Sequence, residues 1–182
     1  AQQNMENVLN EKQQAVVAIS CFEAKGDQQR LAGAINEGLD AGLTVSQVKE
    51  ALSHLYAYTG FPRSLNALGT LQNVLKERKD KGITDEEGRD ASPLPQDYDA
   101  LKQGTEVQTK VSGRAFNYTF APATDYYLKA HLFGDIFARD NLTHSQRELV
   151  TVSALSGLEG CESQLKSHVN GARNMGLSEA EI

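Results

Sequence analysis

The stretch "DAGLTVSQV" (residues 40–48) holds the end of one helix and the start of the next, and it indicates the fold. A glycine after a helical stretch is typical of a helix end, because glycine adopts the left-handed conformation without steric cost. Thr44 followed by Gln47 is the capping-box pattern, in which each side chain binds the other residue's backbone amide. The stretch "NMGLSEAEI" (174–182) repeats the same helix-end and helix-start signals, with a serine and a glutamate in the capping box. We therefore predict two helix pairs that are joined by the same kind of connection.

The similarity between these two regions extends over a longer range. Residues 9–48 align with residues 142–182 after one inserted residue, and Gln13 then falls on Gln146. Capping boxes predict further helix starts after Asn10 and Thr143. Alternating β-type runs are nearly absent, and most segments have helical periodicity. The sequence therefore predicts an all-α fold built from two tandem helical repeats packed together.

The boundaries follow from composition. We expect a first repeat at 1–79, a linker at 80–94 rich in charge, glycine and proline, and a second repeat at 95–182. Within the second repeat we expect helices at about 96–111 and 122–139. The buried side of the latter is predicted to consist of Tyr126, Leu128, Leu132, Phe133, Ile136 and Phe137.

Charge and hydropathy exclude several classes of function. A protein with a net charge of −6 is repelled by the negatively charged phosphate backbone, so we expect no nucleic-acid partner. No apolar run approaches the ~20 residues that cross a bilayer, so we expect no membrane partner either. Without a signal-peptide pattern the expected location is cytoplasmic, or periplasmic if a signal was removed before Ala1. Two cysteines and four histidines predict free thiols, no metal site and no cofactor.

The stretch "EGCESQLKSHVNGA" (159–172) contains the candidate chemistry. Cys161, Gln164 and His168 share one face of a helix, a polar stripe where a core stripe would be apolar. Seven residues span about 10.5 Å of helix, so the cysteine and the histidine cannot touch directly. A water, a substrate or Glu148 would have to bridge them.

These motifs resemble the carboxymuconolactone decarboxylase family, which includes the alkylhydroperoxidase D-like proteins. The resemblance is carried by "RELVTVSALSGLEGCESQLKSHVNGARNMGLSE" in the second repeat and by "HLYAYTGFP" (54–62) in the first. It implies Glu148, Cys161 and His168 as catalytic residues, with His54, Tyr58 and Gln164 as substrate-binding residues. Gln164 stands where the peroxidase-like branch has a second cysteine.

The first repeat lacks this thiol site, because Gln28 and Ala34 stand at the positions of the cysteine and the histidine. The resemblance therefore implies one composite site per chain, completed by His54 and Tyr58 of the same chain or of a neighbouring subunit. It also implies a homo-oligomer, because single-repeat relatives form rings. Three double-repeat chains would recreate a ring of six repeats, so we expect a homotrimer, with a homodimer as the alternative.

Three functions are consistent with these residues. The first hypothesis is a thiol-dependent, peroxidase-type antioxidant activity, in which Cys161 attacks a peroxide and His168 moves the proton. A lone cysteine would then need an external thiol reductant. The alternative enzyme is a decarboxylase of a small lactone or carboxylate, with His54 or His168 as the proton donor. The third hypothesis is a non-catalytic binding or assembly module.

Overall fold

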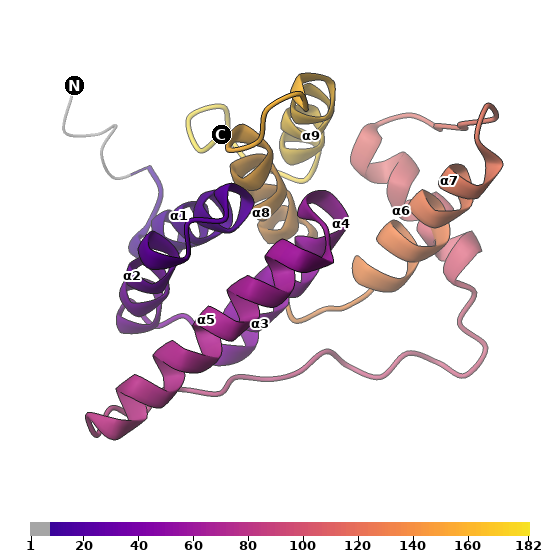
Figure 1. Cartoon of the computed structure of the whole chain (residues 1–182). Helices are drawn as coiled ribbons and strands as arrows, with labels where there is room; N and C mark the ends of the chain where they lie inside the picture. The colour runs from indigo at the N-terminus through magenta and orange to yellow at the C-terminus, as the bar shows by residue number, and fades with distance from the viewer. Residues whose placement is uncertain (1–7) are drawn as a thin grey trace.

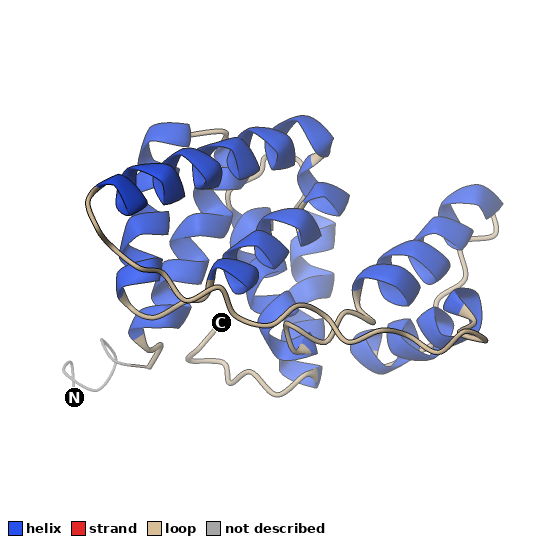
Figure 2. Ribbon diagram, turned by 90° about the horizontal axis from the view of Figure 1, so that it is seen from below, coloured by secondary structure: helices blue, strands red, loops and turns tan. Residues whose placement is uncertain are grey.

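The computed structural model describes residues 8–182, and within that range the chain contains helices and loops but no strand (Figures 1 and 2). This confirms the all-α prediction. The elements are α1 (Glu11–Lys25), α2 (Gln28–Asp40), α3 (Val45–His54), α4 (Tyr56–Thr59), α5 (Phe61–Asp80), α6 (Ala100–Ser112), α7 (Pro122–Tyr126), the π-helix η1 (Tyr127–Ile136), α8 (His144–Ser156) and α9 (Glu162–Asn174). None of these helices is both long enough and apolar enough to cross a membrane.

The predicted capping boxes form as expected. Asn10, Thr44 and Thr143 are the N-cap residues of α1, α3 and α8, and each exchanges hydrogen bonds with the glutamine three residues later. The reciprocal bonds between Ser178 and Glu181 are also present, in a turn at the end of the described range. Gly42 and Gly176 have φ values of 101° and 103°, so both repeats use the same glycine-dependent connection.

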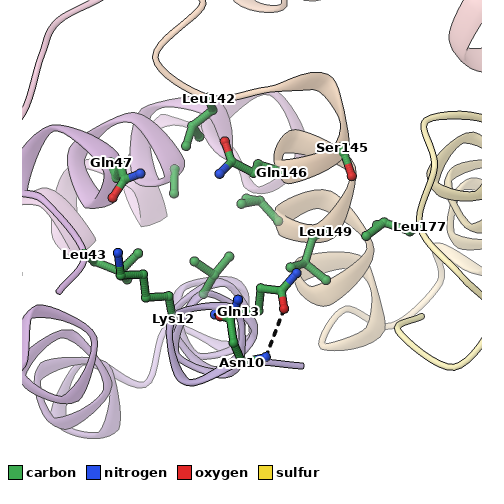
Figure 3. A pocket seen from close by; sticks show the side chains of 13 residues that line it. Asn10, Lys12, Gln13, Leu43, Gln47, Leu142, Ser145, Gln146, Leu149 and Leu177 are labelled. Atoms are coloured by element: carbon green, nitrogen blue, oxygen red, sulfur yellow. Dashed lines mark hydrogen bonds between the residues drawn. The ribbon is translucent and has the colours of Figure 1, made fainter. Parts of the chain in front are cut away.

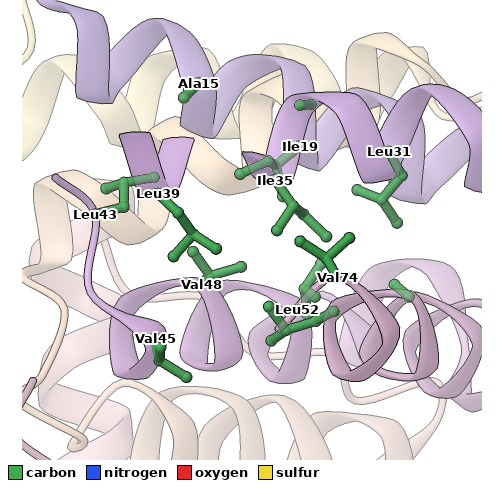
Figure 4. Close-up of a cluster of buried hydrophobic side chains, with 13 residues drawn as sticks. Ala15, Ile19, Leu31, Ile35, Leu39, Leu43, Val45, Val48, Leu52 and Val74 are labelled. Carbon is green, nitrogen blue, oxygen red and sulfur yellow. The ribbon is translucent and has the colours of Figure 1, made fainter. Parts of the chain in front are cut away.

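The main core lies among α1, α2, α3 and α5 (Figure 4). A face of α2 that carries Leu31, Ile35 and Leu39 packs against α1 on one side and against α3 and α5 on the other. These side chains repeat at intervals of four residues, which places them on one stripe of the helix. The periodicity predicted from the sequence is therefore the one that builds this core.

The two repeats meet where α1 packs against α8. Val16 of α1 packs against a buried cluster that includes Leu149 of α8, and Ala24 of α1 belongs to the same buried cluster as Ala154 of α8. Each of these helices is apolar around much of its circumference, so each needs partners on more than one side. The other repeat of the same chain supplies part of that cover.

The pair formed by α6 and η1 stands to one side of the other helices (Figure 1). The two helices pack closely at Gly104, where a Cβ atom would overlap the backbone carbonyl of Lys129. The absence of a side chain at Gly104 therefore allows this approach. The predicted single helix at 122–139 is instead a short α-helix followed by a π-helix, in which the Phe137 amide donates to the Leu132 carbonyl at 3.0 Å.

This change of helix type corrects the predicted buried side of residues 122–139. The side chain of Tyr126 is 53% exposed, so its prediction was wrong, and Leu128 is half-buried. The remaining predicted positions are buried as expected: Leu132, Phe133, Ile136 and Phe137. The helix predicted at 96–111 begins later, at Ala100, and is capped by Asp99.

Between α5 and α6 the chain runs as an extended segment along the outside of α3 (Figures 1 and 2). The Glu86 carbonyl accepts a hydrogen bond from the Val45 amide at 2.9 Å, and the Glu87 carbonyl accepts one from Ser46 at 2.8 Å. These bonds satisfy amides in the first turn of α3 that have no partner within the helix. The segment between the two repeats is therefore bound to the first one.

Candidate active site

Glu148 and His168 form the centre of the candidate site. Glu148 lies on α8 and is fully buried, and His168 lies on α9, where its side chain is 15% exposed. His168 Nδ1 lies 2.8 Å from Glu148 Oε2. This contact orients the imidazole ring and leaves Nε2 as the nitrogen that does not face Glu148.

A glycine allows this close approach. A Cβ atom at Gly171 would lie 3.2 Å from Glu148 Oε2 and 3.1 Å from a methyl group of Val111. Gly171 is on α9, one turn after His168, so the absence of a side chain there leaves space for the carboxylate. The spacing of His168 and Gly171 on one helix thus positions Glu148 against the imidazole.

Two side chains from the first repeat complete the site within the same chain. Tyr58 of α4 lies edge-on to His168, with 5.3 Å between the ring centroids and an interplanar angle of 84°. His54 at the end of α3 lies 5.4 Å from the Tyr58 ring. The site therefore combines residues from both repeats.

The hydrogen bonds of His54 define its role. Its Nδ1 lies 3.2 Å from Arg147 Nη1, and its Nε2 lies 2.7 Å from Thr151 Oγ1. A guanidinium only donates, so Nδ1 accepts and Nε2–H donates to Thr151. Burial lowers the pKa of His54 well below its ordinary value, and the nearby charges of Arg147 and His168 lower it further. The ring is therefore neutral, with its one N–H bound to Thr151 and its lone pair bound to Arg147.

A buried ion network fixes His54 in place. Arg147 Nη2 donates to Glu50 Oε2 at 2.8 Å and to the Arg139 carbonyl at 2.7 Å. Burial raises the pKa of Glu50, but the hydrogen bonds from Arg147 and Asn141 outweigh it, so the net shift is downward. Glu50 is therefore ionised at neutral pH and neutralises the buried guanidinium.

The sequence reasoning missed Arg147, Glu50 and Thr151. A signal was present for the first, since Arg147 begins the Arg-Glu-Leu pattern that pointed to Glu148. The position of Glu50 shows nothing unusual in the sequence, because a glutamate on a helix is ordinarily exposed. Only packing of α3 against α8 brings it to Arg147.

Several polar atoms at the site are buried without a hydrogen-bond partner in the described part of the chain. These are Oη of Tyr58, Oε1 of Glu148 and Nε of Arg147. Burial raises the pKa of the Tyr58 hydroxyl, and the negative charge of Glu148 raises it further, so it stays a neutral donor at ordinary pH. Unpaired buried polar groups are few in folded proteins, and three of them lie at this site.

Cys161 and Gln164 lie apart from these contacts. Cys161 is the N-cap residue of α9 and is half-buried, and its thiol approaches the Glu159 carbonyl at 3.7 Å. Gln164 is exposed on the first turn of α9. The structure gives neither side chain a hydrogen bond to Glu148 or His168. Cys21 on α1 and Cys161 are both free thiols, as predicted.

Comparison with known proteins identifies the family of this chain. The model of the carboxymuconolactone decarboxylase family matches residues 1–73 and 122–182. A 4-carboxymuconolactone decarboxylase from Acinetobacter baylyi is 29% identical over 93 residues, which cover 47% of this chain and 69% of that protein. The two matched segments contain His54 and Tyr58 in the first and Glu148 and His168 in the second. The chain therefore belongs to the carboxymuconolactone decarboxylase family, with two tandem repeats.

Proposed function

We propose that this protein is a proton-transfer enzyme that decarboxylates a small lactone carboxylate, with His168 as the group that carries the proton. The observation that carries the proposal is the 2.8 Å hydrogen bond between His168 Nδ1 and the buried Glu148 carboxylate. This bond holds the orientation of the ring, and it leaves Nε2 as the nitrogen that exchanges a proton with the substrate. The 15% exposure of the His168 side chain gives a substrate access to it.

The chemistry requires such a group. When the bond from a ring carbon to a carboxylate breaks, CO₂ leaves and the electron pair stays on carbon, where a conjugated lactone carbonyl delocalises it. A protonated His168 then delivers its Nε2 proton to the carbon, and solvent restores that proton afterwards. Glu148 positions the imidazole through Nδ1. The Tyr58 hydroxyl, a neutral buried donor beside His168, supports the negative charge on the carbonyl side.

The test is CO₂ release from 4-carboxymuconolactone, the substrate class named by the relative, in ordinary water and in deuterium oxide. We expect turnover, with one deuterium incorporated at carbon. His168→Asn should lower kcat by roughly 100- to 10,000-fold, which is the usual contribution of general acid–base catalysis. Ser163→Ala, an exposed change on the same helix, is the matched control. Undiminished turnover by His168→Asn would overturn the proposal.

A second candidate function is a single-cysteine peroxidase activity. The half-buried Cys161 stands at the start of the helix that carries His168, and it is a free thiol. In that reaction the thiolate attacks one peroxide oxygen, the O–O bond breaks, the other oxygen leaves with the bonding electron pair as hydroxide or alkoxide and takes up a proton, and the sulfur becomes a sulfenic acid. Because Gln164 replaces the second cysteine, an external thiol must then reduce Cys161 through a mixed disulfide.

Cysteine substitutions separate the two functions. Cys161→Ser should abolish peroxide consumption and leave decarboxylation intact, while Cys21→Ser should change neither. Loss of decarboxylation in Cys161→Ser would place the thiol in the main reaction. Mild peroxide should give a sulfenic acid or a mixed disulfide at Cys161, and not a bond to Cys21, which mass spectrometry will distinguish.

We further propose that the chain assembles as a homotrimer, with a homodimer as the alternative. Support comes from large exposed aromatic side chains before and within α7 and at the start of η1: Phe116, Tyr118, Phe120, Tyr126 and Tyr127. Exposed apolar patches of this kind mark interaction surfaces. Light scattering after size exclusion tests the proposal, and a stable particle at the monomer mass of 19.8 kDa would refute both assemblies.

A further inference from the structure

A second feature suited to binding a small molecule lies at the contact between the repeats. A cavity of about 180 Å³ opens among the first turns of α1, α3 and α8 (Figure 3). Its walls are mainly apolar, and neither Glu148 nor His168 lines it. The apolar lining residues are Val16, Leu43, Ala51, Leu142, Leu149, Val150 and Leu177.

The cavity lies where equivalent residues of the two repeats face each other. In the alignment of the repeats, Gln13 corresponds to Gln146, and Leu43 corresponds to Leu177; all four line the cavity. The duplication therefore creates this space, and it belongs to both halves of the chain. The lining is not fully symmetric, since Lys12 in the first repeat stands where the second repeat has a serine.

The rim of the cavity carries hydrogen-bond donors. The side-chain oxygens of Gln47 and Gln146 accept hydrogen bonds from the amides of Thr44 at 3.0 Å and Thr143 at 2.8 Å. The NH₂ group of each glutamine takes no part in these bonds and is free to donate. Figure 3 shows the two side-chain amides facing each other across the opening. Neither NH₂ group has a partner in the described part of the chain.

The charge at the rim is positive. The Lys12 side chain extends along the opening and forms no ion pair with another described residue. No acidic side chain of residues 8–182 lines the cavity. Glu181 lies close by, but its carboxylate accepts from the Ser178 amide at 2.9 Å and interacts with the side chain of Gln13. An apolar cavity with a cationic, donor-rich rim complements a ligand with an apolar body and one carboxylate.

We propose that this cavity binds a cyclic or aromatic monocarboxylate of about the size of benzoate. A buried apolar cavity of about 150 Å³ is large enough to hold benzene. The 180 Å³ found here accommodates such a ring against Ala51 and Leu149, with the carboxylate at the rim. Lys12 then provides the countercharge, and the amides of Gln47 and Gln146 donate to the carboxylate oxygens.

Benzoate itself is the probe, titrated into the whole chain by calorimetry and followed by amide chemical shifts. We expect saturable binding with one site per chain, and the largest shifts around Ala51. Lys12→Met should weaken benzoate binding about fivefold, as an exposed ion pair does, and leave the binding of neutral benzyl alcohol unchanged. Ala51→Leu should abolish the binding of both probes by filling the cavity. Val16→Phe is the substitute if that variant does not fold.

Two controls separate this site from the others. Lys49→Met removes an exposed lysine of α3 that is paired with Glu87, and it should not affect benzoate binding. His168→Asn should bind benzoate as the wild type does, since the active site is not involved. No saturable binding at millimolar benzoate, equal affinity in Lys12→Met, or loss of binding in His168→Asn would each overturn the proposal. So would a dimer that Ala51→Leu dissociates, because a second copy would then occupy the cavity.

Discussion

Glu23 should make this protein less stable as the pH rises. It lies near the end of α1 with 1% of its surface exposed. Its Oε2 is 2.9 Å from Thr59 Oγ1, which is also 3.0 Å from the Leu55 carbonyl oxygen. The Thr59 hydroxyl has one hydrogen, so its donation to Glu23 Oε2 competes with donation to the Leu55 carbonyl. Glu23 Oε1 is buried without a hydrogen-bond partner in the described part of the chain, so ionising this carboxyl is unfavourable.

The magnitude follows from the pKa of this carboxyl. Burial raises the pKa of Glu23 from 4.5 to about 7, against the opposing effects of Thr59 and Arg63. Between these values the folded state binds more protons than the unfolded state, so the free energy of unfolding falls as the pH rises. At 1.36 kcal/mol per pH unit, the loss is about 3 kcal/mol. It is absent below pH 4.5 and complete above pH 7.

Glu23→Gln tests this reasoning, because the amide keeps the shape and an oxygen that accepts from Thr59 but cannot ionise. Urea unfolding followed by circular dichroism should give similar stabilities for the variant and the wild type near pH 4.5. At pH 8 the variant should be about 3 kcal/mol more stable. Glu77→Gln, an exposed change on α5, should not alter the pH dependence. An equal difference between Glu23→Gln and wild type at both pH values would refute the argument.

Three further predictions concern packing around the site. Glu50→Gln should destabilise the fold by about 3–5 kcal/mol, because it leaves the buried Arg147 guanidinium without a carboxylate partner. Arg147→Met should cost less, because Glu50 keeps its ion pair with Arg139, and the double variant should lose less than the sum, which urea unfolding measures. Gly104→Ala should cost about 1–3 kcal/mol in thermal unfolding, since its methyl group overlaps the backbone of η1, and a neutral effect would contradict the close packing. Gly171→Ala should displace Glu148 and lower the rate of decarboxylation roughly tenfold with little loss of stability. Unchanged kinetics would contradict a catalytic role for the hydrogen-bonded pair of Glu148 and His168.

The sequence by itself determined the local structure. Capping boxes at Asn10, Thr44 and Thr143 and the glycines at 42 and 176 appear as predicted. Each of these features is made by residues within about four positions of one another, so a short stretch of sequence is enough to predict it. The family resemblance likewise identified Glu148 and His168, which the structure joins by a hydrogen bond.

Only the tertiary structure decided which groups meet across the chain. Periodicity could not reveal that residues 127–136 form a π-helix. That segment packs closely against α6, and this contact joins residues that are distant in the sequence. Periodicity could not show that Glu50 is buried with Arg147, or that His54 has both nitrogens engaged. These outcomes depend on how α3, α8 and η1 pack. The pKa and the available protons of a buried group depend on neighbours that are distant in the sequence, so its chemical role follows from the packing.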